Sequence, residues 1–347
     1  MFSRSIRPLT LVVTGLAIIS CTDETTAPDL TTDNPALETS PDLASEAMTA
    51  SRWTPMADMP STERARLATA MVPNTSGQSV LYVIGGSTTS SGASLSKVMA
   101  YNAATNTWTY KASLPVPLYW TNGTGVINGK IYISGGLSAY KRYRAELYMY
   151  DPAKNTWTEK QRMPNTTFRG VTGVINNQLY VLTGCDQEDC EYYVPTAFYR
   201  YNPVTDQWTT LTAPPSGYYG WASGGTIGGK LYVTGQGDGG ALLMMYDPAT
   251  DTWTRKTPLN HVRIMAASAT VAAKLYVIGG NGTLSDGSSG TLRTVSIYDP
   301  ATDSWTNKAP LPEPRFNLSA SRVLVNGRAR IQLVGGPRPG NNLQYTP

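Results

Sequence analysis

One pattern recurs six times along this chain: an apolar strand that ends in Gly-Gly or a near variant, a turn that follows a Tyr, and then a single Trp. Its glycines are Gly85, Gly135, Gly184, Gly235, Gly279 and Gly335. Its tryptophans are Trp53, Trp108, Trp157, Trp208, Trp253 and Trp305. Successive glycines lie 50, 49, 51, 44 and 56 residues apart. A unit of this size cannot bury its apolar faces alone, so neighbouring units must stack against one another.

The order of the motifs predicts how the two ends of the chain meet. Trp53 precedes the first Gly-Gly, whereas Gly335-Gly336 has no tryptophan after it. Six units match six tryptophans only if a strand around Trp53 joins the last unit. Such closure would remove the unpaired strand edges that an open ring presents. We therefore expect a closed ring in which an N-terminal strand completes the C-terminal blade.

Each unit predicts four antiparallel strands. In the second unit, Thr124–Ile127 leads through Asn128-Gly129, a pair suited to a tight hairpin, into Ile131–Ile133. Leu147–Tyr150 is the third expected strand, and Trp157 begins the outer one. Helix-period patterns are absent, and the 32 Gly and 24 Pro supply the turns that an all-β fold needs.

The repeated Gly-Gly, Tyr and Trp positions resemble the kelch repeat. The resemblance extends over residues 52–347 and implies a six-bladed kelch-type β-propeller with four-stranded antiparallel blades, closed by the N-terminal strand. Gly184-Cys185 and Gly235-Gln236 lack the second glycine of the motif. These departures leave the expected number of blades unchanged.

The N-terminus predicts export. Residues 1–20 have two arginines, an apolar run too short to span a membrane comfortably, and then Cys21 after Ile18-Ile19-Ser20. These residues resemble a bacterial lipobox, which implies a signal peptide over 1–20 and lipidation of Cys21. An ordinary secretory signal with an incidental cysteine is the alternative. Residues 21–51, rich in Thr, Asp, Glu, Pro and Ala, predict a disordered tether. We expect a lipid-anchored protein of the bacterial envelope, in the periplasm or at the outer membrane or cell surface.

Charge and cysteine content exclude several classes of partner. Without the two signal-peptide arginines the chain carries 26 basic and 24 acidic residues, which does not favour nucleic acid, and contact with the membrane is expected only through the lipid. The oxidising compartment favours a disulfide between Cys185 and Cys190. Two thiols without nearby histidine make a poor metal site, so we expect no metal and no cofactor. We expect a monomer.

Binding residues are expected in the loops between strands at one face of the ring, because variable loops on a rigid scaffold usually carry recognition. Aromatic and arginine side chains gather in these loops, and such residues are enriched at binding sites. The candidates are Tyr119, Trp120, Tyr140, Arg142, Arg144, Phe168, Arg169, Tyr218, Tyr219, Trp221, His261, Arg263, Arg315 and Phe316. The alternative for each residue is that it packs beneath a loop or pairs with a neighbouring carboxylate.

The sequence favours a non-catalytic protein over an enzyme. His261 is the only histidine, and no G-x-S-x-G surrounds a candidate nucleophile. We therefore expect an interaction propeller that binds a protein, peptide or glycan.

An alternative function comes from resemblance in fold and compartment to the periplasmic sialic-acid mutarotase group, which implies a Glu and an Arg at the channel mouth. Arg169, Arg263 or Arg315 could contact a sugar carboxylate. Candidate carboxylates are Glu63, Glu188, Asp238 and Glu313. No motif matches that group residue by residue.

Overall fold

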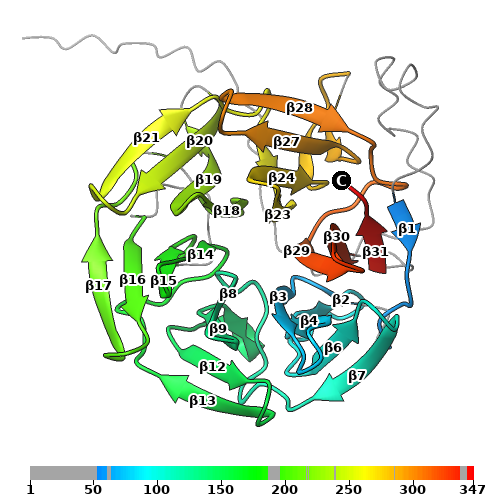
Figure 1. The fold of residues 1–347 in the computed structure, drawn as a ribbon. Helices are drawn as coiled ribbons and strands as arrows, with labels where there is room; N and C mark the ends of the chain where they lie inside the picture. The colour runs from blue at the N-terminus through cyan, green and yellow to red at the C-terminus, as the bar shows by residue number, and fades with distance from the viewer. Residues whose placement is uncertain are drawn as a thin grey trace, which may run out of the picture.

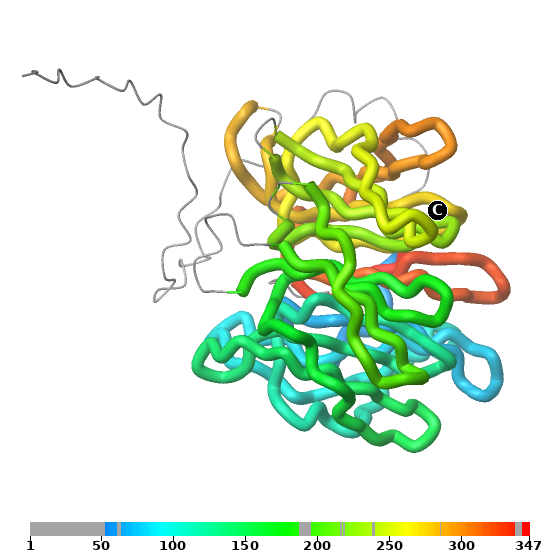
Figure 2. The backbone as a smooth tube through the Cα atoms, turned by 90° about the vertical axis from the view of Figure 1, so that its left-hand side faces the viewer, coloured from blue at the N-terminus to red at the C-terminus, as the bar shows by residue number. Residues whose placement is uncertain are grey.

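The structure is a computed structural model that describes residues 53–60, 64–186, 196–215, 217, 219–237, 240–284, 286–336 and 342–347. Within these residues, six four-stranded antiparallel sheets surround a central axis (Figure 1). Figure 2 gives a side view, in which the connections between strands emerge at two opposite ends of the ring. The prediction of an all-β propeller is confirmed.

The six sheets follow one another along the chain. The first contains β3 (Ala68–Pro73), β4 (Ser79–Ile84), β6 (Val98–Asn102) and β7 (Thr107–Lys111). The second contains β8 (Thr124–Ile127), β9 (Lys130–Ser134), β12 (Leu147–Asp151) and β13 (Thr156–Lys160). The third contains β14 (Val171–Ile175), β15 (Gln178–Leu182), β16 (Phe198–Asn202) and β17 (Gln207–Leu211). The fourth contains β18 (Gly224–Ile227), β19 (Lys230–Gly237), β20 (Gly240–Asp247) and β21 (Thr252–Lys256). The fifth contains β23 (Ala267–Val271), β24 (Lys274–Ile278), β27 (Val295–Asp299) and β28 (Ser304–Lys308).

The sixth sheet joins the two ends of the described chain. It contains β29 (Leu318–Val325), β30 (Arg328–Gly335), β31 (Asn342–Tyr345) and the N-terminal strand β1 (Trp53–Pro55). β1 pairs with β31 so that Trp53 lies opposite Tyr345, and the centroids of their two rings are 4.9 Å apart. A buried amide chain supports the junction, because Gln332 donates to Asn342, and Asn342 Nδ2 donates to the Ala57 carbonyl at 2.7 Å.

Short strands decorate the ends of the blades. β2 (Arg64–Ala65) pairs with β5 (Ser87–Thr88), and β10 (Leu137–Ser138) pairs with β11 (Arg142–Tyr143) around a 3-10 turn at Ala139–Lys141. β22 (Arg263–Ile264), β25 (Asn281–Thr283) and β26 (Ser289–Thr291) form a three-stranded sheet. In each blade the first strand lies nearest the axis and the tryptophan strand lies at the rim (Figure 1).

Each motif tryptophan fastens its blade to the preceding one. Trp108 Nε1 donates to the Ala57 carbonyl at 2.7 Å, while the Ala57 amide donates to Asn106 Oδ1 at 2.8 Å. The Tyr101 hydroxyl also donates to Asn106 Oδ1, at 2.7 Å. Four more blades repeat this arrangement, with tryptophan–carbonyl distances of 2.8 to 2.9 Å. In the sixth blade Trp53 Nε1 donates to the Ala309 carbonyl at 3.3 Å.

The motif glycines allow the next blade to approach. Gly85 has φ +61°, and a Cβ atom there would lie 2.3 Å from the carbonyl oxygen of Leu118. The following amide, that of Gly86, donates to this same carbonyl at 2.7 Å. The second blade repeats the contact between its Gly-Gly and the Thr167 carbonyl. A side chain at either glycine would separate adjacent blades.

The apolar core lies between the sheets. Tyr82 and Ile84 of the first sheet belong to one buried cluster with Ile131 and Tyr150 of the second. Such inter-sheet packing is the reason that no single unit buries its own faces.

The β1–β31 junction predicts a large loss of stability when its stacked ring is removed. Trp53→Ala should lower the free energy of unfolding by about 3–5 kcal/mol, because a buried indole is replaced by a cavity. Urea unfolding measures this change. Tyr140→Ala is the matched control, since the Tyr140 side chain is 95 % exposed and its loss should cost under about 0.5 kcal/mol. An equally stable monomer after deletion of residues 53–60 would contradict the role of this strand.

The rim carboxylates predict acid sensitivity. Hydrogen bonds from Tyr298 and from the Thr257 amide lower the pKa of Asp303. At Asp206 and Asp251 burial is the largest single influence and raises the pKa, but the hydrogen bonds and nearby cations of each carboxylate together outweigh it and lower the pKa overall. A carboxyl whose pKa is lowered on folding stabilises the protein above its unfolded pKa of about 4, and this contribution is lost as pH falls through the folded pKa. The urea midpoint should therefore fall between pH 6 and pH 3.

A triple variant, Asp206→Asn, Asp251→Asn and Asp303→Asn, is the control for this pH dependence. Asn106 and Asn155 already occupy the equivalent positions in the first two blades and keep the acceptor oxygen. The variant should show a smaller change of midpoint with pH. An unchanged slope would assign the acid sensitivity to other groups.

Candidate functional site

Six residues with left-handed backbone surround one end of the central channel. Each directly precedes the inner strand of its blade or lies within four residues of it. They are Arg66 (φ 60°), Trp120 (φ 49°), Arg169 (φ 60°), Trp221 (φ 65°), Met265 (φ 57°) and Asn317 (φ 55°). We call these six residues the mouth ring. Glycine adopts this conformation at lower cost, so six larger side chains here suggest that the side chains are used.

Backbone hydrogen bonds join the mouth ring into a circle. The amide of Trp120 donates to the Arg66 carbonyl at 3.0 Å, and the amide of Arg169 donates to the Trp120 carbonyl at 2.9 Å. The same bond links each later member to the one before it, at 3.0 to 3.4 Å. The amide of Arg66 completes the circle by donating to the Asn317 carbonyl at 3.1 Å.

Arginine and tryptophan alternate over the first four positions of the mouth ring. The guanidinium carbon of Arg169 lies 3.6 Å from the ring centroid of Trp120 and 3.3 Å from that of Trp221. The guanidinium carbon of Arg66 lies 4.4 Å from the Trp120 ring. Cation–π contacts of this kind contribute about 2 kcal/mol or more when they are shielded from water. These contacts therefore hold two guanidinium groups beside two indole rings.

A hydroxyl-lined cavity of about 240 Å³ lies inside the mouth ring. Thr69, Thr124, Thr172, Ser268 and Ser319 each line it from the inner strand of a blade. Their hydroxyls also link blades: Thr69 Oγ1 lies 2.7 Å from Ser319 Oγ, and Thr124 Oγ1 donates to the Thr69 carbonyl at 2.5 Å. The described lining includes two arginines and no Asp or Glu. Such a cavity suits an anionic group.

A hairpin extends this site outward. Phe168 stacks on Trp120 with centroids 6.5 Å apart, and on Tyr143 of β11 with centroids 5.4 Å apart. The tip of the β10–β11 hairpin carries Tyr140, which is 95 % exposed, together with exposed Lys141 and Arg142. Basic and aromatic side chains therefore continue from the mouth ring to the hairpin tip.

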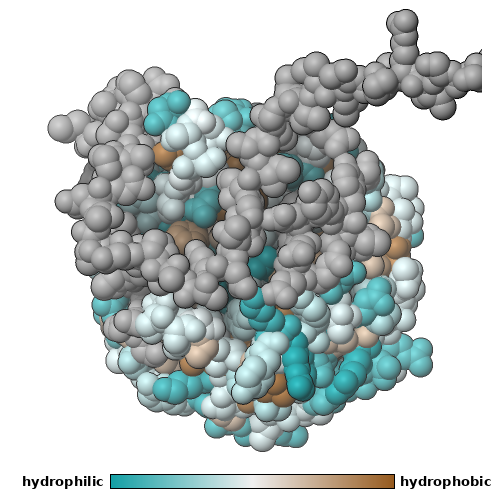
Figure 3. Space-filling model, turned by 180° about the vertical axis from the view of Figure 1, so that it is seen from behind, coloured by the Kyte–Doolittle hydropathy of each residue, from teal (hydrophilic) through white to brown (hydrophobic). Residues whose placement is uncertain are grey.

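Several predicted site residues come together here. Trp120, Arg169 and Trp221 are members of the mouth ring, and Phe168, which is 1 % exposed, packs on Trp120 as part of the core. Tyr140 and Arg142 lie on the adjoining hairpin. His261 is exposed and Phe316 is half-buried. On the face shown in Figure 3, hydrophilic and hydrophobic residues are interspersed where the surface is described.

Two predicted binding tyrosines are core residues instead. Tyr119 is 8 % exposed and packs with Leu137 and Phe168, while Tyr219 is 2 % exposed and packs against Leu242. Burial raises the pKa of Tyr219 to about 12. Their burial favours the alternative interpretation, in which an aromatic residue packs beneath its loop.

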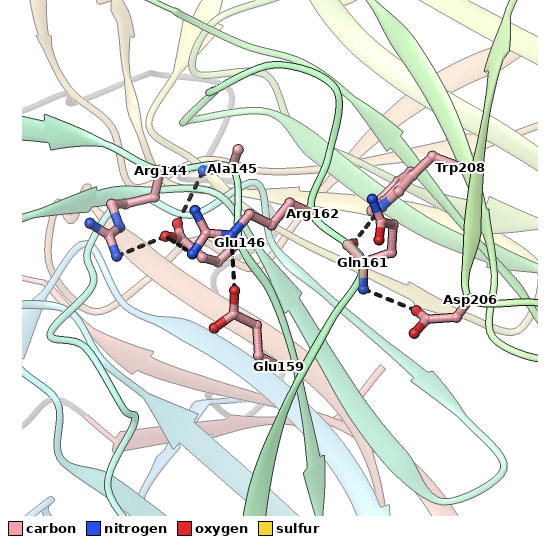
Figure 4. A network of polar contacts seen from close by, with 8 residues as sticks. All are labelled: Arg144, Ala145, Glu146, Glu159, Gln161, Arg162, Asp206 and Trp208. Atoms are coloured by element: carbon pink, nitrogen blue, oxygen red, sulfur yellow. Dashed lines mark hydrogen bonds and ion pairs between the residues drawn. The ribbon is translucent and has the colours of Figure 1, made fainter.

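Three predicted arginines have structural partners. Arg144 Nη2 lies 2.8 Å from the buried Glu146 carboxylate, which Arg162 also approaches at 3.3 Å (Figure 4). Arg263 donates to the Val277 carbonyl and to Ser296. Arg315 is buried and lies 3.8 Å from Glu313. These arginines support loops and are not among the lining residues of the cavity. This agrees with the alternative interpretation of the sequence, in which such residues pair with neighbouring groups.

Other predictions fall wholly or partly outside the described residues. Tyr218, Cys21 and Cys190 lie there, so lipidation and the Cys185–Cys190 disulfide stay predictions. Cys185 itself is buried and packs with Phe168. Within the described ranges, no group of three or more His, Cys, Asp or Glu is arranged to hold a metal ion. No helix among them is long and apolar enough to cross a membrane.

The sequence interpretation missed three members of the mouth ring: Arg66, Met265 and Asn317 were not among the candidates. A weak signal precedes the inner strands. Each mouth-ring residue lies two to four positions before a small pair formed by Thr, Ser or Gly and then Gly or Ala. The pairs are Thr69-Ala70, Thr124-Gly125, Thr172-Gly173, Gly224-Gly225, Ser268-Ala269 and Ser319-Ala320.

Comparison with known proteins identifies the repeat. The KLHDC2/KLHL20/DRC7 Kelch-repeats domain matches residues 69–264, and the Kelch motif matches residues 263–312. Human Kelch repeat and BTB domain-containing protein 12 is 29 % identical over 241 residues, 61 % of this chain and 38 % of that protein. Kelch-like protein terF of Aspergillus terreus is 28 % identical over 254 residues, 69 % of this chain and 54 % of that protein. The chain thus spans about two fifths to one half of the length of these relatives.

A solved structure shares the fold. The structure of YjhT superposes with a TM-score of 0.65 over 84 % of this chain and 95 % of that chain, at 15 % sequence identity. At this identity the likeness concerns the fold alone. The match of the kelch-repeat domain to more than half of the sequence establishes that this chain belongs to the kelch-repeat family.

Proposed function

We propose that this protein is a non-catalytic binding propeller that captures an acidic segment of a partner protein at the mouth ring. One observation carries the proposal: the guanidinium group of Arg169 contacts the rings of both Trp120 and Trp221 and lines a cavity whose described lining has no carboxylate. Membership of the kelch-repeat family supports a protein-interaction role.

The chemistry of the mouth favours an anionic ligand. A guanidinium group binds a carboxylate with charge-assisted hydrogen bonds along its edge, while its flat face stacks on an aromatic ring. Trp120 and Trp221 meet edge to face, with an interplanar angle of 85°, and both rings contact the guanidinium group of Arg169. The arginine is therefore ordered before a ligand arrives, which lowers the entropic cost of binding.

The shape of the surface favours a peptide over a compact ligand. Trp120 packs on Phe168, which is buried, and Phe168 packs on Tyr143 of the hairpin whose exposed tip is basic, so the mouth ring and the hairpin adjoin. An extended acidic segment could place one carboxylate at the mouth ring and others beside Lys141 and Arg142. Contacts at two places would increase affinity through effective concentration.

We also propose that the propeller acts at the bacterial envelope. The support is in the sequence: a basic and apolar leader over residues 1–20, followed by Cys21 and a polar segment before Trp53. Anchoring by lipid would hold the ring near other envelope proteins.

The proposed function predicts charge-selective peptide binding. A chain that begins at Thr22 should bind a fluorescein-labelled peptide of alternating Glu and Ser, and should not bind the matched Lys and Ser peptide. Arg169→Gln should weaken binding about tenfold, because a charge-assisted hydrogen bond contributes about 1.5–3 kcal/mol. Fluorescence anisotropy measures both affinities.

The matched control is Arg328→Gln. Arg328 is exposed and begins β30. Asn317 lies just before the start of β29, whereas Arg328 lies just after its end, so the length of β29 separates Arg328 from the mouth ring. It should leave peptide affinity unchanged, and thermal unfolding should show that both variants remain folded. Equal binding of the acidic and basic peptides, or equal effects of the two substitutions, would contradict the proposal.

A sugar-acting enzyme of the sialic-acid mutarotase type is the second candidate. Arg66 and Arg169 beside a hydroxyl-lined cavity could also hold the carboxylate of an acidic sugar. Of its candidate carboxylates, Glu313 lies 3.8 Å from Arg315, and Glu63, Glu188 and Asp238 lie outside the described residues.

Exchange NMR of sialic-acid anomers distinguishes the two functions. The binding proposal predicts the same interconversion rate with and without protein. A rate that rises with protein and falls again with Arg169→Gln would instead establish the enzyme.

A further inference from the structure

One position lies at the seam between neighbouring blades, two residues before each member of the mouth ring. The residues at this position are Arg64, Leu118, Thr167, Tyr219, Arg263 and Arg315. The carbonyl of Leu118, for example, accepts from the Gly86 amide of the preceding blade at 2.7 Å. At Arg64 the seam joins the last blade to the first, because a Cβ atom at Gly335 would lie 3.2 Å from the Arg64 carbonyl oxygen.

The Arg64 side chain is fully buried, yet most of its guanidinium group is not hydrogen-bonded. Arg64 is 0 % exposed. Its Nη2 donates to the Lys97 carbonyl at 2.6 Å, whereas Nε and Nη1 have no hydrogen-bond partner in the described part of the chain. Burial lowers the pKa of Arg64 to about 10, so the group still carries its positive charge at neutral pH.

The equivalent arginine of the fifth blade is better matched to its surroundings. Arg263 begins β22 as Arg64 begins β2, and it donates to the hydroxyl of Ser296 on β27 at 3.1 Å. The residue of β6 that corresponds to Ser296 in strand register is Met99, which has no hydroxyl to accept from Arg64. The first blade therefore buries a guanidinium group without the polar side chain that the fifth blade supplies.

A buried guanidinium group in this state favours an anionic partner. Buried donors are nearly always hydrogen-bonded, and a buried charge without a counter-charge destabilises the fold. An anion meets both needs, because it accepts charge-assisted hydrogen bonds and neutralises the group. The ribbon that carries Arg64 is only two residues long on each strand, and residues 89–93 that follow it are exposed. A small movement of this ribbon admits a small ion.

We propose that Arg64 binds a small monovalent anion, of the size of chloride or formate, at the seam between the first and last blades. The ion accepts hydrogen bonds from Nε and Nη1 and so stabilises the closed ring. This site is separate from the mouth ring, and it depends neither on the charge of the mouth arginines nor on the proposed function.

Thermal unfolding at constant ionic strength tests the proposal. The sample is the chain that begins at Thr22, which retains every described residue. Replacing gluconate with chloride, up to about 200 mM, should raise the Tm with saturation, because an ion that binds only the folded state stabilises it. The expected rise is about 2–4 °C for a chain of this size. Formate replaces chloride in a parallel titration, and the larger rise identifies the preferred ion.

A pair of variants assigns the effect to one arginine. Arg64→Met removes the donors and should abolish the dependence of the Tm on chloride or formate. Arg263→Met, at the equivalent position of the fifth blade, should keep it. An equal dependence in the Arg64→Met variant and the unaltered chain would place the ion elsewhere and overturn the proposal.

Bromide diffraction tests the site without any substitution. Crystals grown with sodium bromide should show an anomalous peak within hydrogen-bond distance of Nε or Nη1 of Arg64. Peaks confined to the exposed surface would mean an adventitious ion only and would overturn the proposal. A Tm that does not respond to chloride or formate would also overturn it, since water then satisfies the buried donors.

Discussion

The circle of backbone hydrogen bonds at the mouth is the constraint on which the site depends. One residue of each blade takes the left-handed conformation in this circle. The circle therefore fixes the backbone positions from which six side chains extend. The circle passes through the bond between Arg66 and Asn317, which belong to the first and last blades. The pairing of β1 with β31 therefore supports the site as well as the fold, because separation of these blades would break the circle beside Arg66.

Hydrogen bonds also join adjacent blades at the outer rim of the ring, where side chains take part. There the Trp–carbonyl and Asn or Asp–amide contacts hold adjacent blades at their outer edge, while the mouth ring holds them at the axis. Two circles of contacts at different radii resist both splaying and tilting of the blades. This rigidity holds Arg169 against two indole rings that meet edge to face.

Sequence reasoning succeeded where a contact demands one residue type. The indole donor of Trp108, the hydroxyl of Tyr101 and the missing side chain of Gly85 recur in nearly every blade, so their period predicts the fold. The mouth ring shares only a backbone conformation, and its side chains differ from blade to blade. No period of residue identity marks Met265 or Asn317, so they were missed.

The role of each loop arginine depends on its neighbours in space, and the sequence shows only some of these neighbours. Arg144 and Arg315 each lie two residues from the glutamate that they approach, which favoured the structural interpretation. Arg169 has no acid so near in sequence, and its partners Trp120 and Trp221 come from the two flanking blades. These cation–π contacts bring together side chains about 50 residues apart, which no local pattern of the sequence predicts.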